Sequence, residues 1–246
     1  MPMKVTSLHF ALPMVVSVLW SHTQAFAQFT DKSKLPVSDK DSYERLKIEQ
    51  QDYGYVLQTA IWPRDQDGSY NIYVCWQNSS GHYEKEKSWV KNSVSESWSK
   101  FAPINFLYWG DCSTNQSGIR IRISDSGPHV TALGARLSMQ NQEMVLNFSF
   151  NNWSETCKAS EGRRKSCIES IAVHEFGHAL AFAHEHNRWD RPGECTERPQ
   201  GSDGNRLLTE YDPKSVMNYC NPVYNNDGQL SDLDIKSVRI VYGERR

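Results

Sequence analysis

The clearest chemical pattern in this 246-residue sequence is a glutamate beside two histidines that lie four residues apart. His174 and His178 fall in a predicted helix over 165–181, so both rings leave one helical face about a turn apart. Two neutral imidazoles at that distance can bind one Zn²⁺ ion through nitrogen. Glu175 follows the first histidine, where its carboxylate can reach a water molecule on the metal. The spacing HExxH therefore predicts a zinc site with a carboxylate beside it.

A chance pair of histidines on a surface helix is the alternative interpretation. The neighbouring helix residues argue against exposure because they are apolar: Ile171, Ala172, Phe176, Ala179, Leu180 and Ala181. Such residues would bury the helix, and buried imidazoles need polar partners.

A third histidine strengthens the prediction of a metal site. His184 lies six residues after His178, beyond helical register, so the helix must end and the chain must turn back. His184 would then face the same ion, and three protein nitrogens would leave a fourth position for water. We expect His186 at the surface or beside the ligands, and a role as an alternative ligand stays open.

The segment 174–191, HEFGHALAFAHEHNRWDR, matches the metzincin pattern HExxHxxGxxH. Among metzincins it is most similar to the astacin proteases, with serralysins and matrixins next. In astacins the third histidine is followed by Glu, then by Arg and an Asp-Arg pair. Those positions here are Glu185, Arg188, Asp190 and Arg191. The glycine of the pattern is Ala181 here, and alanine at a left-handed angle costs on the order of 1 kcal/mol relative to glycine.

A second match lies in YDPKSVMNYC, residues 211–220. Metzincins have a methionine turn beneath the zinc, and astacins and serralysins add a tyrosine two residues later. The resemblance implies that Met217 forms a floor under the histidine rings, although Met217 alone could be core packing. It also implies that Tyr219 is a fifth zinc ligand that swings away to hydrogen-bond the tetrahedral intermediate. The segment 230–243 resembles the C-terminal helix of metzincins.

The resemblance implies a zinc-dependent endopeptidase. Zinc would activate water and polarise a carbonyl, and Glu175 would act as the general base that passes a proton to the leaving amine. Metzincins bind a polypeptide substrate extended along the edge strand of the sheet, which we place near 129–137. Two alternatives stay open: a non-enzymatic, zinc-containing peptide-binding module, and an amidase acting on cell-wall peptides.

The pattern of elements predicts an α+β fold, with the order β-α-β-β-β-β-α before an irregular half. Runs of β-forming residues predict strands at 70–76, 104–109, 118–124, 143–150 and, more weakly, 129–137. Apolar residues at helical spacing predict an amphipathic helix over 84–101, and a final helix is expected at 231–242. The metzincin resemblance implies a twisted, mostly five-stranded sheet, two long helices, and an irregular C-terminal lobe with the methionine turn and terminal helix.

Residues 1–27 are typical of a secretory signal peptide. Lys4 precedes an apolar run at 10–20, and small residues at 25 and 27 predict cleavage after Ala27. A run of about eleven apolar residues is too short to cross roughly 30 Å of hydrocarbon. We therefore expect a secreted protein, extracellular or periplasmic, without stable membrane insertion.

The charged segment 28–52 predicts an N-terminal arm or a short pro-segment. Residues 53–246 would form the catalytic domain, with an upper lobe over about 53–181 and a lower lobe over about 182–246. The prodomain motif FxGD of astacins does not occur in 28–60, where Asp52 is the nearest candidate. The resemblance also implies that Glu185 pairs with the amine of a newly cut N-terminus.

Six cysteines follow the predicted signal peptide: Cys75, Cys112, Cys157, Cys167, Cys195 and Cys220. An even number in an exported chain predicts disulfides, with buried free thiols as the alternative. Proximity in the sequence favours the pairs Cys75–Cys112, Cys157–Cys167 and Cys195–Cys220. The formal net charge is −2 and there is no basic block, so we expect no nucleic-acid partner.

Overall fold

The computed structural model describes residues 55–78, 82–114 and 116–245. All of them belong to one compact unit, Ile48–Arg246. The predicted signal peptide and the segment 28–52 lie outside the described residues. Among the described residues, no helix combines the length and apolar character needed to span a bilayer.

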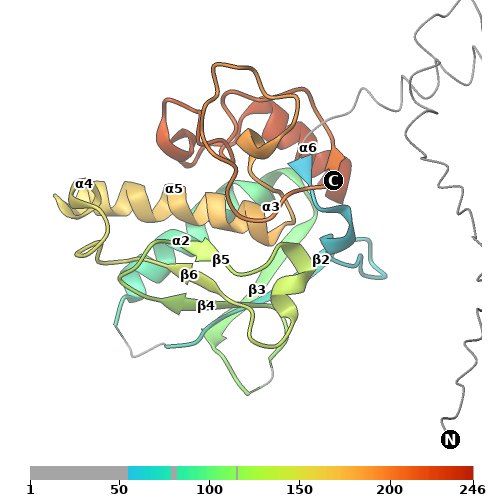
Figure 1. Cartoon of the computed structure of the whole chain (residues 1–246). Coiled ribbons are helices and arrows are strands. Elements are labelled where there is room, and N and C mark those ends of the chain that lie inside the picture. The colour runs from blue at the N-terminus through green and yellow to red at the C-terminus, as the bar shows by residue number, and fades with distance from the viewer. Residues whose placement is uncertain (1–54, 79–81, 115, 246) are drawn as a thin grey trace, which may run out of the picture. The chain divides into compact units, whose positions relative to one another are not determined.

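A five-stranded sheet forms the lower layer in Figure 1, with strand order β3-β2-β4-β6-β5. The bounds are Tyr70–Trp76 for β2, Ile104–Asp111 for β3, Ile119–Ile123 for β4, His129–Val130 for β5 and Met144–Leu146 for β6. Strands β2, β3, β4 and β6 pair in parallel, whereas β5 pairs antiparallel with β6. Strand β5 is therefore an edge of the sheet, and the predicted α+β class with a five-stranded sheet is confirmed.

Two of the predicted strands are shorter than expected. Strand β6 ends at Leu146 because the Asn147 side chain accepts hydrogen bonds from the backbone N–H groups of Ser149 and Phe150, which turns the chain. The predicted strand 129–137 gives way to the 3-10 helix η4, Gly134–Ser138. Gly134 has φ 55°, and a Cβ there would lie 1.9 Å from the Ala60 carbonyl oxygen, so the chain turns at this glycine.

The long helices α2, Glu84–Glu96, and α5, Glu161–Ala179, pack beside the sheet. The helix predicted over 84–101 is interrupted at Ser97, whose hydroxyl donates to the Ser93 carbonyl, and α3, Trp98–Phe101, follows. Helix α5 starts earlier than expected because the Ser160 side chain caps it by accepting from the Arg163 N–H.

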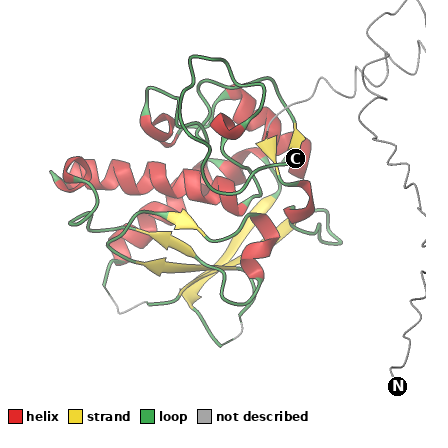
Figure 2. Cartoon of the chain, in the orientation of Figure 1, coloured by secondary structure: helices red, strands yellow, loops and turns green. Residues whose placement is uncertain are grey.

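The remaining elements are short, apart from the terminal helix. They are β1 at Tyr55–Val56, η3 at Gln58–Ala60, α4 at Glu155–Lys158, η5 at Glu185–Asn187, β7 at Arg206–Leu207, η6 at Tyr224–Gly228 and α6 at Asp232–Tyr242. Figure 2 shows the sheet on one side of α5 and mostly loops on the other. Helix α5 therefore separates a regular region from an irregular one.

The apolar core lies between the sheet and the helices. On α5, Phe176 stacks on Trp109 and meets Phe106 edge-on. Trp98 stacks on Phe182 and donates its indole N–H to the Val173 carbonyl, which ties α3 to α5. These contacts fix the helix that carries the histidines.

Three disulfides join the six cysteines in the predicted pairs. They are Cys75–Cys112, Cys157–Cys167 and Cys195–Cys220. The first joins the ends of two neighbouring strands, the second joins α4 to α5, and the third ties the loop after the histidines to the methionine turn.

Candidate metal centre

The last two turns of α5 and the segment after it bring three imidazoles together. The Nε2 atom of His184 lies 3.2 Å from Nε2 of His174 and 3.1 Å from Nε2 of His178. All three side chains are buried, and together they form a group that could hold a metal ion. Nitrogens 2.0–2.1 Å from a tetrahedral zinc ion would be about 3.3–3.4 Å apart, so the spacing fits this metal.

The other ring nitrogen of each histidine bonds to a backbone carbonyl. Nδ1 of His174 lies 2.8 Å from the Val216 oxygen, Nδ1 of His178 lies 2.8 Å from the Phe182 oxygen, and Nδ1 of His184 lies 2.9 Å from an oxygen of the loop at 200. A carbonyl can only accept, so each Nδ1 carries the proton and each Nε2 presents a lone pair. Three converging lone pairs repel one another unless a cation lies between them, which makes this donor set suited to a metal.

Burial keeps these rings neutral. It lowers the pKa of His174 to about 3, and it lowers the pKa values of His178 and His184, in each case chiefly by desolvation of the charged form. Neutral imidazoles are the form that binds metals. The environment therefore favours ligation at neutral pH.

The turn between His178 and His184 is made by alanine at a left-handed angle. Ala181 has φ 70°, as the missing glycine of the pattern led us to expect. The Phe182 N–H bonds to the Gly177 carbonyl and the Ala181 N–H to the His178 carbonyl, which is the Schellman arrangement of a helix end. The N–H of Leu57 also donates to the Ala181 carbonyl, so the segment after β1 braces the turn.

Glu175 is buried beside the first histidine. Its Oε2 atom has no hydrogen-bond partner among the described residues, and burial raises the pKa of its carboxyl to about 8. A buried carboxylate without a partner is unfavourable. A dication nearby would favour the charged form and lower that pKa. The orphaned oxygen is thus a second observation that suits a metal and a polar substrate.

The site opens into a cleft of about 320 Å³. Its walls include Glu175, His178, His184 and Tyr219 on the metal side, and His129 to Leu133 on the side of strand β5. Two of the three predicted metal ligands and the edge of the sheet therefore face the same space.

Tyr219 and Met217 lie close to the histidines. The Tyr219 ring is 5.4 Å from the His174 ring with the planes 12° apart, and 4.5 Å from the His184 ring. Burial raises the pKa of the Tyr219 phenol. The sulfur of Met217 lies 2.4 Å from where a Cβ on Gly177 would be. Gly177 was not singled out from the sequence, although a glycine inside a long helix signals a close approach.

His186 is completely buried, so the expected surface position is wrong. It does not join the metal-binding group. Its Nδ1 accepts a hydrogen bond from the Tyr219 N–H at 3.3 Å, and the two rings stack 4.9 Å apart. Its place beside the ligands agrees with the other expectation, since its ring also lies 4.9 Å from that of His184.

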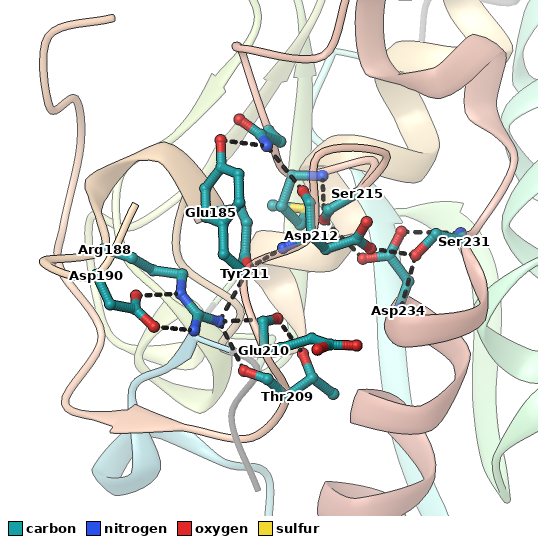
Figure 3. A network of polar contacts seen from close by, with 12 residues as sticks. Glu185, Arg188, Asp190, Thr209, Glu210, Tyr211, Asp212, Ser215, Ser231 and Asp234 are labelled. Carbon is teal, nitrogen blue, oxygen red and sulfur yellow. Dashed lines mark hydrogen bonds and ion pairs between the residues drawn. The ribbon is translucent and has the colours of Figure 1, made fainter. Parts of the chain in front are cut away.

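A buried polar network lies on the loop side of α5 (Figure 3). Arg188, which is 1% exposed, donates to Glu185 at 2.9 Å, to both oxygens of Asp190 and to the Thr209 carbonyl. Glu185 also accepts from the Asp212 N–H at 2.9 Å. The guanidinium holds the pKa of Asp190 below its usual range. The network joins the segment after His184 to the segment before the methionine turn.

No family model matches the sequence, and no curated protein matches it either. The fold does resemble solved structures. A structure of myroilysin is 22% identical, covers 78% of this chain and 100% of that chain, and has a TM-score of 0.55. A crystal structure of myroilysin is 22% identical, covers 75% of this chain and 86% of that chain, and has a TM-score of 0.50. High choriolytic enzyme 1, a hatching enzyme zinc-protease from the medaka fish Oryzias latipes, is 20% identical over 76% and 96%, with a TM-score of 0.53. The predicted resemblance to astacin-like metzincins is thereby confirmed at the level of the fold.

Proposed function

We propose that this protein is a secreted, zinc-dependent endopeptidase. The observation that carries the proposal is that the Nε2 atoms of the three histidines converge. The carboxyl of Glu175, whose Oε2 has no hydrogen-bond partner among the described residues, lines the same cleft along the sheet edge. The shared fold with a hatching enzyme zinc-protease supports it. The three disulfides suit an oxidising compartment, either extracellular or periplasmic.

Each side chain of the site has a role in this proposal. Zinc, when bound by the three histidines, supplies a Lewis acid that polarises a carbonyl and makes water a better nucleophile. Glu175 accepts the proton of the attacking water and passes it to the leaving amine as general base and then general acid. Tyr219 carries its phenol proton at neutral pH, as any tyrosine does, and burial raises its pKa further, so it can donate to the developing oxyanion.

Strand β5 is the proposed binding edge for a polypeptide. It pairs with β6 on one side, and residues of the strand line the cleft. An extended substrate can add to such an edge by backbone hydrogen bonds. Pairing through the backbone does not discriminate between side chains, so specificity must come from the cleft walls.

We also propose that Glu185 receives the amine of a mature N-terminus, as the astacin resemblance implies. A small cavity of about 10 Å³ lies beside it, with Asp212 and Asp234 among the lining residues. That volume is about the size of one water molecule, and an ammonium group among carboxylates would be stabilised there. Mass spectrometry of the secreted protein tests this role: an N-terminus at Gln28 would contradict it, because the arm would still be attached.

The decisive variant for the reaction is Glu175→Gln. We expect it to retain zinc, measured by elemental analysis, and to lose hydrolysis of casein. Wild-type digestion should also stop when a chelator removes the metal. Digestion by Glu175→Gln would refute the general-base role. A wild-type protein that holds zinc but cleaves neither casein nor cell-wall peptides would be a peptide-binding module, and one that cleaves only the latter would be an amidase.

A further inference from the structure

A line of hydrogen bonds joins His174 to a buried carboxylate of the terminal helix. Nδ1 of His174 donates to the Val216 carbonyl at 2.8 Å. The N–H of Met217, in the same peptide group as that carbonyl, donates to Ser215 Oγ at 3.0 Å. The Ser215 hydroxyl then donates to Asp234 Oδ1 at 2.7 Å. The last step is visible in Figure 3.

All these hydrogen bonds run in one direction, from the imidazole toward the carboxylate. The peptide group accepts at its oxygen and donates at its nitrogen, so it is polarised in the same direction as its neighbours. A negative charge therefore stands at one end of the line and the metal-binding Nε2 at the other. Carboxylates that bond to a ligand histidine fix its ring and raise its basicity. Here the same effect would pass through a hydroxyl and a peptide group.

The contacts of Asp234 exceed what a helix cap requires. Ser231 and Asp234 form the capping box of α6, in which each side chain accepts from the backbone N–H of the other. Asp234 additionally accepts from the Val216 N–H at 2.9 Å and from Ser215. The residue is only 7% exposed. Burying a carboxylate is costly, and a capping box can form at the surface, so the buried position points to a further role.

We propose that Asp234 is a positioning residue of the metal site, acting on His174 through Ser215 and the Val216–Met217 peptide group. It orients the imidazole and strengthens its Nε2 atom as a ligand. The proposal rests on zinc binding by the three histidines. It goes beyond that binding because it assigns control of the zinc affinity to a capping residue of α6, more than fifty residues from His174 in the sequence.

Zinc affinity, measured by competition with a chromophoric chelator, tests the proposal. We expect Ser215→Ala and Asp234→Asn each to weaken zinc binding about 10–100-fold. Because both lie on one line, the double variant should lose little more than either single variant. Ser215→Thr keeps the hydroxyl and should restore affinity. Asp232→Asn, the control, changes an exposed carboxylate in the same helical turn and should leave the zinc affinity unchanged.

Urea unfolding of the metal-free protein separates positioning from helix capping. Ser215→Ala leaves the Ser231–Asp234 box intact, so it remains informative if Asp234→Asn does not fold. Wild-type zinc affinity in Ser215→Ala, or additive losses in the double variant, would overturn the proposal. Absence of zinc binding by the wild-type protein would instead refute the proposed metal site itself.

Discussion

The two sides of helix α5 hold the candidate metal site by different means. On the sheet side, His174, His178 and Glu175 are carried by a helix whose position is fixed by apolar packing. On the loop side, His184 and Tyr219 stand on irregular backbone held by buried ions, hydrogen bonds and one disulfide. Apolar packing is non-directional, whereas buried polar groups are costly when a partner is lost. The loop side should therefore respond more steeply to single polar substitutions.

The largest expected effect is loss of the buried arginine. Arg188→Met leaves Glu185 and Asp190 without their cation, which typically costs about 3–5 kcal/mol. Urea unfolding measures the change, and Lys100→Met, at an exposed ion pair of 3.8 Å, is a matched control expected to lose about 0–1 kcal/mol. Similar losses for both variants would contradict the high cost expected for polar groups buried on the loop side.

The second effect is a pH dependence of stability that comes from Asp234. Burial raises the pKa of this carboxyl to about 6. A carboxyl with a raised folded-state pKa keeps its proton longer when folded, so its contribution to stability is present below about pH 4 and lost as pH rises through about 6. As pH rises between these limits, the unfolding free energy of Asp234→Asn should therefore increase by about 2–3 kcal/mol relative to that of the metal-free wild type. Urea unfolding at several pH values measures this, with Asp232→Asn as control. A pH-independent difference would contradict the shift.

A third prediction concerns the place where the two sides meet. Gly177→Ala puts a methyl group 2.4 Å from the Met217 sulfur and 3.0 Å from the Trp98 ring. Such overpacking typically costs about 1–3 kcal/mol. The destabilisation caused by Gly177→Ala should be smaller when Met217 is also replaced by Ala. A double-mutant cycle on unfolding free energies detects this coupling. Strictly additive free-energy changes would mean that the added methyl group does not clash with the Met217 sulfur.

The smallest expected effect is at the turn. Ala181→Gly relieves a left-handed alanine but adds flexibility to the unfolded chain, so the two terms nearly cancel. We expect a change in unfolding free energy below about 1 kcal/mol. A loss well above that would show that the Ala181 methyl, which is fully buried, contributes more by packing than it costs in strain.

The regular side of the molecule was largely predictable from the sequence. Helical spacing placed His174 and His178 on one face, and proximity in the chain favoured the disulfide pairs that the structure contains. Strand ends were less predictable, because the Asn147 turn depends on a side chain that bonds locally.

The loop side was less predictable, for physical reasons. Val216 contributes a carbonyl to His174, and any residue carries one. The burial of His186 depends on loops distant in sequence, and Asp234 resembles an ordinary helix cap until its contacts with Ser215 are known. Catalytic roles for Glu175 and Tyr219 stay predictions.

Zinc content tests the central claim most directly. After dialysis against metal-free buffer and reloading with zinc, elemental analysis should find one tightly held zinc ion per chain, and the variant His178→Ala should lose it. A correctly folded wild-type protein that retains no zinc would contradict the account.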